Sequence, residues 1–259
     1  MTKRIFIYWF LTIAFLSLSS CTDDLDDKIK YVKNIVETSE SGTEKTTTFF
    51  YNQAQLVRIE SAETIKVFTY TADLITKIET TTLSNNSKTI VNYSYNNGKL
   101  QTVQSDGDYV INYTHNQDGT ISYEKFDISL LPLPVKLHHG KLYFDNGNII
   151  REERTLDNVG VGVLSRYYVN YEYDLKSNPL HHIQGYEKLL DHEGIISTNN
   201  YLISTVETSV EKDGQIISSA SFYKNTFKYD KRNYPVEKNS LVSIPHKGIS
   251  YNLKTTYHY

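Results

Sequence analysis

The stretch TIVNYSYNNGKLQTV, residues 89–103, decides the fold because it contains a complete β-hairpin. Val91, Tyr93 and Tyr95 alternate with polar residues, and this period of two places the three side chains on one face of a strand. Asn97-Gly98 follows, a dipeptide that readily adopts the positive φ angles of a tight hairpin turn. Apolar residues then return five and eight positions after the last tyrosine. The stretch therefore predicts strand, turn and strand, with one face rich in rings.

The same unit recurs along the chain, which contains 22 tyrosines in 259 residues. An aromatic residue ends one strand, a polar turn follows, and apolar residues come back in the next strand. Clear copies begin at Tyr51, Tyr70 and Tyr95, and weaker copies begin at Tyr113, Phe144, Tyr173 and Tyr229. Further hairpin dipeptides occur at Asp118-Gly119, Asn146-Gly147 and Asp213-Gly214. The repeat predicts hairpin after hairpin.

The predicted fold class is all-β, an antiparallel meander of about sixteen strands in repeated hairpins. A single sheet of that width must curl, so we expect an open barrel or a half-shell. A short helical turn is expected near residues 186–192. The run Leu130–Pro134 interrupts the pattern because proline cannot donate to a β-ladder. It predicts a pseudo-boundary near residues 128–140 within one domain of residues 30–259, with two domains as the alternative.

The N-terminus has the layout of a secretory signal peptide. Lys3 and Arg4 precede an apolar run of about 14 residues, shorter than the roughly 20 that a membrane-spanning helix needs. The run ends in Leu18-Ser19-Ser20-Cys21, which resembles the lipobox of bacterial lipoproteins. We predict cleavage after residue 20 and lipidation of Cys21, which would attach the protein to a membrane. The alternative is an uncleaved signal anchor with an incidental thiol.

Residues 21–29 are predicted to form an acidic tether. Like charges repel and keep such a segment extended. In some Gram-negative bacteria, acidic residues beside the lipidated cysteine resemble a signal for the outer face of the outer membrane. The four residues concerned are Asp23, Asp24, Asp26 and Asp27. The sequence therefore predicts an outer-membrane location with surface exposure as an option.

Charge and composition exclude several functions. Removing residues 1–20 leaves 25 basic residues against 30 acidic ones, a formal charge of −5. That balance argues against nucleic acid as a partner. The single cysteine, Cys21, excludes disulfides and, once acylated, thiolate chemistry. Oligomeric state is not predictable from these features.

Candidate catalytic and metal-binding motifs are weak. Neighbouring strand residues point to opposite faces, so His138-His139 and His181-His182 do not have chelating spacing on strands. Gly160 and Gly162 lack the rest of a phosphate-binding loop, and the chain has no Gly-x-Ser-x-Gly elbow. We predict no cofactor, no metal site and no enzyme. The alternative is a hydrolase whose carboxylates and histidines are assembled across strands.

Four tyrosines are candidates for stacking against a glycan or peptide ligand: Tyr95, Tyr171, Tyr173 and Tyr229. Their rings could form a platform and their hydroxyls could bond the ligand. Alternating tyrosines on successive strands also suit core and cross-strand packing in a curled sheet. The pattern favours packing over a ligand platform.

Several motifs resemble known families. Tyr93-Ser-Tyr95-Asn-Asn-Gly98, Tyr171-Glu-Tyr173-Asp174 and Phe227-Lys-Tyr229-Asp230 resemble the tyrosine–aspartate repeats of the Rhs and teneurin families. The chain is also similar to a family of secreted bacterial lipoproteins of unknown function, which share the lipobox, Asn178-Pro179, Asn199-Asn200 and Tyr234-Pro235. The resemblance implies a porin-like or shell-like β-sheet and no activity.

An integral porin is disfavoured because positions between the rings are often Lys, Asn, Glu or Thr. The leading hypothesis is a lipid-anchored, non-enzymatic scaffold or binding module of the cell envelope. The alternative is a ligand carrier whose barrel encloses a glycan, peptide or lipid.

Overall fold

The computed structural model describes residues 29–129, 132–190 and 197–259, which form sixteen β-strands and two short 3₁₀ turns. The strands are β1 (Asn34–Ser39), β2 (Glu44–Asn52), β3 (Gln55–Glu60), β4 (Thr64–Thr71), β5 (Leu74–Thr82), β6 (Ser87–Asn96), β7 (Lys99–Ser105), β8 (Tyr109–His115), β9 (Ile121–Asp127), β10 (Val135–Asp145), β11 (Asn148–Leu156), β12 (Val163–Ser177), β13 (Asn199–Lys212), β14 (Gln215–Tyr229), β15 (Pro235–Ile244) and β16 (Ile249–His258). The turns are η1 (Tyr186–Leu189) and η2 (Pro245–Lys247). The described residues contain no helix that is long and apolar enough to cross a membrane.

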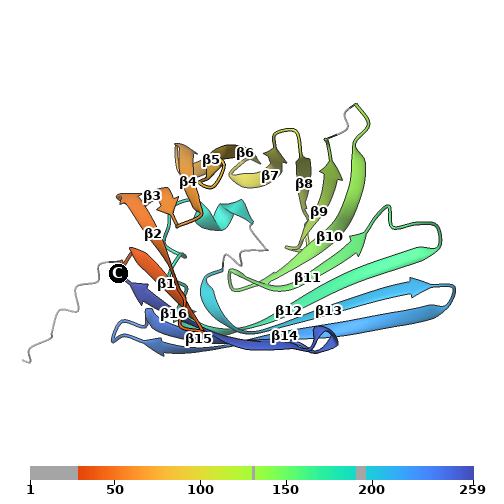
Figure 1. Cartoon of the computed structure of the whole chain (residues 1–259). Helices are drawn as coiled ribbons and strands as arrows, with labels where there is room; N and C mark the ends of the chain where they lie inside the picture. The colour runs from red at the N-terminus through yellow and green to blue at the C-terminus, as the bar shows by residue number, and fades with distance from the viewer. Residues whose placement is uncertain (1–28, 130–131, 191–196) are drawn as a thin grey trace, which may run out of the picture.

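The strands form one closed barrel in which every strand pairs antiparallel with its sequence neighbours (Figure 1). Strand β1 closes the ring by pairing with both β2 and β16, with Ile35 opposite Tyr257. The predicted all-β meander of about sixteen strands is confirmed, and the sheet closes into a barrel. Strands β9 and β10 pair across the loop that contains Pro132 and Pro134, so the same barrel continues there; Leu130 and Leu131 lie outside the described residues.

In the first three copies of the repeat, the structure explains why a tyrosine recurs at the end of the strand. At Tyr51, Tyr70 and Tyr95 the ladder shifts by a β-bulge next to the ring. Each hydroxyl then donates to a backbone carbonyl of an earlier strand or segment; Tyr95 bonds the oxygen of Ile75 at 2.9 Å. The apolar residue five positions after each tyrosine is almost fully buried: Leu56, Ile75 and Leu100 are at most 1% exposed. The repeat therefore joins each hairpin to the one before it.

Three of the four predicted hairpin dipeptides have the expected geometry. Asn97-Gly98, Asn146-Gly147 and Asp213-Gly214 have positive φ at both residues. At Asp118-Gly119 only the glycine does, because the Asp118 side chain instead accepts hydrogen bonds from the backbone N–H and hydroxyl of Thr120. That loop is longer than the two-residue turn that the sequence predicted.

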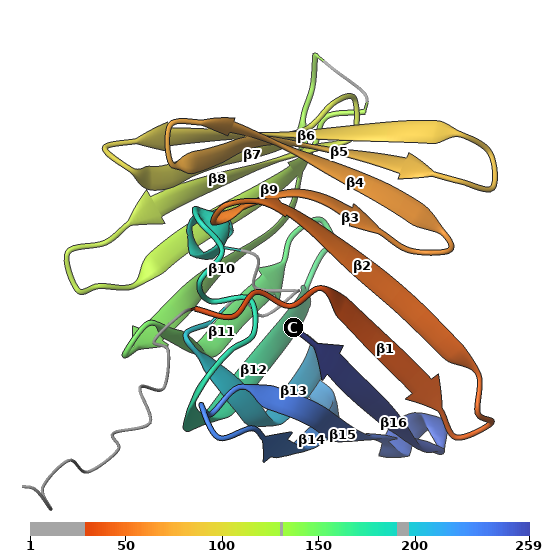
Figure 2. The same cartoon turned by 90° about the vertical axis from the view of Figure 1, so that its left-hand side faces the viewer.

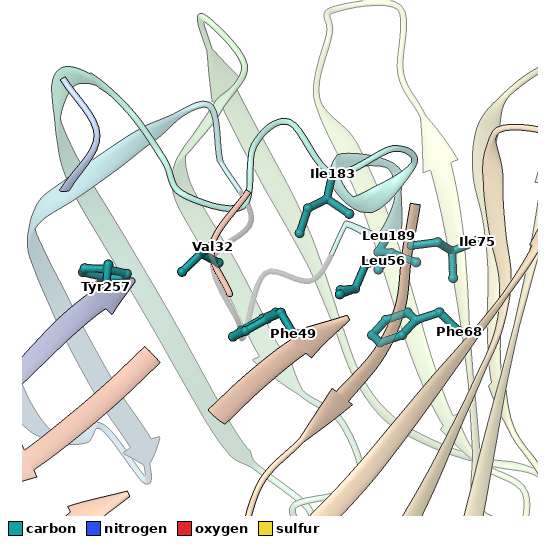
Figure 3. Close-up of a cluster of buried hydrophobic side chains, with 8 residues drawn as sticks. All are labelled: Val32, Phe49, Leu56, Phe68, Ile75, Ile183, Leu189 and Tyr257. Carbon is teal, nitrogen blue, oxygen red and sulfur yellow. The ribbon is translucent and has the colours of Figure 1, made fainter. Parts of the chain in front are cut away.

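The ring-bearing face of the sheet points into the barrel. Phe49, Leu56, Phe68, Ile75 and Tyr257 gather inside it (Figure 3). Opposed residues of an antiparallel pair share a face, so the register carries this assignment around all sixteen strands. Residues in register with these five, directly or through intermediate strands, are called inner residues below, and the alternating set is called outer.

Two segments enter the barrel at one end (Figure 2). One is the N-terminal segment 29–33, and the other is the first part of the connection between β12 and β13, residues 178–190. Val32, Ile183 and Leu189 are at most 5% exposed and pack in the same cluster as Leu56 and Ile75. We call the two segments the plug. The sequence predicted a weak hairpin copy between Tyr173 and Ile183; this was wrong, because a long connection replaces the turn and fills the barrel end.

Candidate functional site in the barrel interior

The plug closes one mouth of the barrel through backbone contacts as well as apolar packing. The backbone N–H of Gln184 donates to the carbonyl of Ala54 at 2.9 Å, and its side-chain amide donates to Asp73 at 2.5 Å. Gly185 adopts φ 72°, and a Cβ there would lie 2.6 Å from the carbonyl oxygen of Asp73. The plug is thereby fixed to the β2–β3 and β4–β5 turns.

The opposite mouth is open to solvent. Inner side chains near it remain accessible although they point into the barrel: Val210 is 42%, Ile217 76% and Tyr251 44% exposed. Close to the plug, by contrast, Leu56 and Ile75 are completely buried, and the tyrosines around them are partly buried. The interior therefore changes along the barrel axis from a packed core to a wet, accessible wall.

A buried charge network lies on the inner wall of strands β9 to β11. The Tyr123 hydroxyl donates to the Glu152 carboxylate, and Arg154 donates through Nε to Glu152 at 2.9 Å and to Tyr123 at 3.1 Å. A second Arg154 nitrogen lies 2.7 Å from Glu152. Glu152 is 2% exposed, and the Arg154 guanidinium also lies 4.9 Å from the ring of Tyr167. An ion pair in this position requires all of its hydrogen bonds.

The network depends on a glycine in the middle of a strand. A Cβ at Gly140 would lie 2.5 Å from the Tyr123 ring and 2.4 Å from the carbonyl oxygen of Glu153. Burial, and then the Glu152 charge, raise the pKa of Tyr123 far above its ordinary value. Burial opposes the charge of Arg154, but Glu152 and Tyr123 raise its pKa overall. Tyr123 therefore stays neutral and acts as a hydrogen-bond donor to a fixed ion pair.

The inner wall carries more positive than negative side chains along the described strands. The inner basic residues are Lys45, Lys66, Lys125, Arg154, Lys212 and Lys238, and the inner acidic residues are Glu37, Asp127 and Glu152. Rings of basic side chains favour anions inside barrels and pores. The net charge of the inner wall is therefore positive, whereas the formal charge of the whole chain is −3.

A polar groove of about 520 Å³ lies mainly among outer residues of strands β8 to β12. Its wall includes Glu124, Lys141, Glu153 and Tyr168. Lys141 also contacts Asp118 at 3.2 Å, and Arg151 pairs with Glu153 at 2.6 Å. Its charged groups are thus largely neutralised by neighbours, which makes it a weaker candidate than the interior.

The four candidate stacking tyrosines all belong to the inner wall, and three have hydroxyls bonded within the barrel. Tyr95 donates to Ile75, Tyr173 donates to the carbonyl of Ile149 at 2.7 Å, and Tyr229 donates to Asp174. The Tyr171 ring lies 6.3 Å from that of Tyr173 and 6.2 Å from that of Tyr201. The rings form part of the interior surface, while these three hydroxyls contribute to structure.

The aspartates of the tyrosine–aspartate motifs also have a structural role, because they accept backbone hydrogen bonds. Asp174 accepts the backbone N–H groups of Lys176 and Asn200, at 2.9 and 3.1 Å. Asp230 accepts those of Arg232 and Tyr234, and it pairs with Lys30 of the plug. The residues predicted to be lipidated or to direct export, Cys21, Asp23, Asp24, Asp26 and Asp27, lie outside the described residues.

One of the two histidine pairs lies on a strand, and its two side chains point to opposite faces of the sheet, as strand geometry requires. His138 points inward with its ring 5.9 Å from that of Tyr123, and His139 points outward and contacts Asp157 at 2.8 Å. His181 and His182 lie in the plug connection, with ring centroids 4.9 Å apart. Within the described ranges, no group of three or more His, Cys, Asp or Glu side chains is placed to hold a metal ion.

Sequence reasoning missed the network of Glu152 and Arg154. The run IIREERTL, residues 149–156, looks like an ordinary charged strand, because inward and outward charges follow the same alternation. One signal was present: Gly140 interrupts a strand, and a mid-strand glycine often marks the close approach of another group.

Comparison with known proteins supports the barrel and adds no activity. No protein-family model matches the chain, and no curated protein matches it either. A porin-like protein from Bacteroides vulgatus aligns over 88% of this chain and 98% of its own, with 13% identity and a TM-score of 0.52. A porin-like protein from Bacteroides uniformis aligns over 89% and 98%, with 12% identity and a TM-score of 0.50. The fold is porin-like. At these identities the likeness concerns the fold alone.

Proposed function

We propose that this chain is an exported lipoprotein of the outer membrane, anchored through Cys21, whose porin-like barrel stands in water as a non-enzymatic binding module. In this proposal, a ligand such as a glycan or peptide enters through the open mouth and contacts the inner wall. The observation that carries the proposal is the distribution of side chains: most of the repeat's rings point inward, and the outer face carries ion pairs.

The outer face has ion pairs around much of the circumference. Lys88 contacts Glu79 at 2.8 Å, Arg151 contacts Glu153 at 2.6 Å, and Glu237 contacts both Lys228 and Lys254. A membrane-spanning barrel instead presents an apolar band to lipid, and charges at its midplane are destabilising. The charged outer face is therefore suited to water.

Strand length supports the same arrangement. Strands β1 and β3 have 6 residues each, and β7, β8 and β9 have 7 each. A β-strand that crosses a bilayer needs about 9–11 residues. Strand β4 has 8 residues, so six of the sixteen strands are too short to span the hydrocarbon layer.

The test is fatty-acid labelling of the full chain in a Gram-negative host, followed by fractionation. We expect labelled palmitate to enter the wild type and to be absent from Cys21→Ser, with Ser20→Ala as a matched control that keeps the label. Released Cys21→Ser protein should be folded and soluble without detergent. Equal labelling of wild type and Cys21→Ser would contradict the anchor, and a barrel that stays folded only in detergent would contradict the water-facing wall.

A further inference from the structure

Three inner residues lie side by side on neighbouring strands just inside the plug. Lys238 of β15 is the register partner of Thr255 of β16, and Thr255 is the register partner of Glu37 of β1. Tyr257, two residues beyond Thr255, belongs to the packed cluster of the closed end. The row therefore lies where the packed core gives way to the accessible wall.

Lys238 is more buried than the exposed inner lysine Lys66 and lacks the kind of partner that Arg154 and Lys125 have. Its side chain is half-buried, and no carboxylate oxygen in the described part of the chain lies within 4.0 Å of its ammonium group. Burial lowers the pKa of Lys238, and the more distant Glu37 opposes that effect. By contrast, Arg154 has Glu152, and Lys125 lies 4.1 Å from the ring centroid of Tyr109. A buried charge without such compensation is unfavourable, so its presence suggests a ligand.

Thr255 provides a second, independent observation. The residue is 1% exposed, and its hydroxyl oxygen has no hydrogen-bond partner in the described structure. Buried hydroxyl groups in folded proteins are almost always bonded. An unused hydroxyl donor in register with an unpaired ammonium group is the arrangement that an acceptor anion would satisfy.

We infer that Lys238 and Thr255 bind the carboxylate of a small, hydroxyl-rich ligand, that is, a sugar acid. This inference rests on the proposed function, since the ligand must reach the interior. The carboxylate would accept from both groups, as charge-assisted bonds favour. Phe227, opposite Lys238 in the register, lies 5.8 Å from the ring of Tyr229 in a stacked pair that offers a face to a sugar ring.

The surrounding wall favours a sugar acid over a fatty acid. Inner positions on β13, β14 and β15 include Ser204, Ser221, Asn225 and Ser240, and Ser240 donates to Asn225 at 2.7 Å. A hydrocarbon tail requires a mainly apolar lining, whereas a sugar can exchange hydrogen bonds with hydroxyls and amides. The polar wall therefore selects the hydroxyl-rich ligand.

The binding test uses the mature chain with Cys21→Ser and three probes: glucuronate, the matched neutral sugar glucose, and decanoate. Calorimetry should give glucuronate at least about tenfold higher affinity than glucose. Lys238→Met should abolish that preference, and Thr255→Val should reduce it. Lys66→Met, which removes another inner lysine from an exposed position, should leave it unchanged. Equal affinity for the two sugars, preference for decanoate, or an unaffected Lys238→Met variant would overturn the inference.

A ligand-free measurement separates this inference from the proposed function. If the ammonium group has no protein partner, Lys238→Met should raise the melting temperature of the free protein by about 2–4 °C. A lower melting temperature would reveal an internal partner and would overturn the inference even if lipidation and solubility in water are confirmed.

Discussion

The two ends of the barrel use the same strands for different purposes. At the plug end, the inner residues Leu56 and Ile75 and the plug residue Val32 are completely buried, and tyrosine hydroxyls bond the backbone of neighbouring segments. At the open end, inner residues such as Val210 and Ile217 remain exposed to solvent. This difference indicates that most of the stabilising burial lies where segments 29–33 and 178–190 enter the barrel. The open end is left free for contact with other molecules.

The largest expected effect comes from the buried network of the closed end. Glu152→Gln would leave Arg154 buried without a carboxylate, and breaking such a pair costs about 3–5 kcal/mol. We expect a loss of that size in the free energy of unfolding, measured by urea denaturation. Glu153→Gln, one residue away on the outer face, should cost less than about 1 kcal/mol. Similar losses in the two variants would contradict the assignment of inner and outer faces.

The apolar core gives a direct comparison between the two ends. Leu56→Ala removes a fully buried side chain from the plug cluster and should cost about 2–5 kcal/mol of unfolding free energy. Val210→Ala, at an inner but 42% exposed position, should cost less than about 1 kcal/mol. The same denaturation experiment measures both. A large effect at Val210 would mean that the open end is packed as tightly as the plug end.

The smallest effect is expected on the outer face at low pH. Hydrogen bonds from Lys228, Lys254 and Asn239 lower the pKa of Glu237 from 4.5 to about 2. Because the folded pKa is depressed, this stabilisation is present above pH 4.5 and is lost as the pH falls towards 2. Glu237→Gln should therefore melt slightly below wild type at pH 7, and the two curves should converge near pH 2. A difference that persists at pH 2 would assign the effect to packing.

The sequence predicted the strands because each one carries its own local signals. Val91, Tyr93 and Tyr95 alternate with polar residues, and Asn97-Gly98 turns the chain, so the hairpin needs no distant information. Closure of the barrel is different. Ile35 pairs with Tyr257 across almost the whole chain, and no local pattern in either strand specifies that partner. The alternatives of open shell and closed barrel could only be separated in three dimensions.

The interior site was less predictable for a related reason. Lys238 and Thr255 are ordinary strand residues, and their importance comes from burial and from register with one another. The plug was hidden in the same way, because Ile183 fits the spacing of a hairpin copy although it lies in a long connection. The tyrosines were visible from the sequence, but which hydroxyls are bonded within the barrel depends on the bulges beside them.

The measurement that tests the central claim most directly is solvent accessibility of the outer wall in the membrane-anchored protein. The lone cysteine is Cys21, so single cysteines introduced at Glu79, Glu153 and Lys254 can each carry a spin label on otherwise unmodified protein in lipid vesicles. A barrel that stands in water predicts that a water-soluble nickel complex relaxes all three labels more strongly than oxygen does. Stronger relaxation by oxygen at these positions would place the wall in lipid and contradict the account.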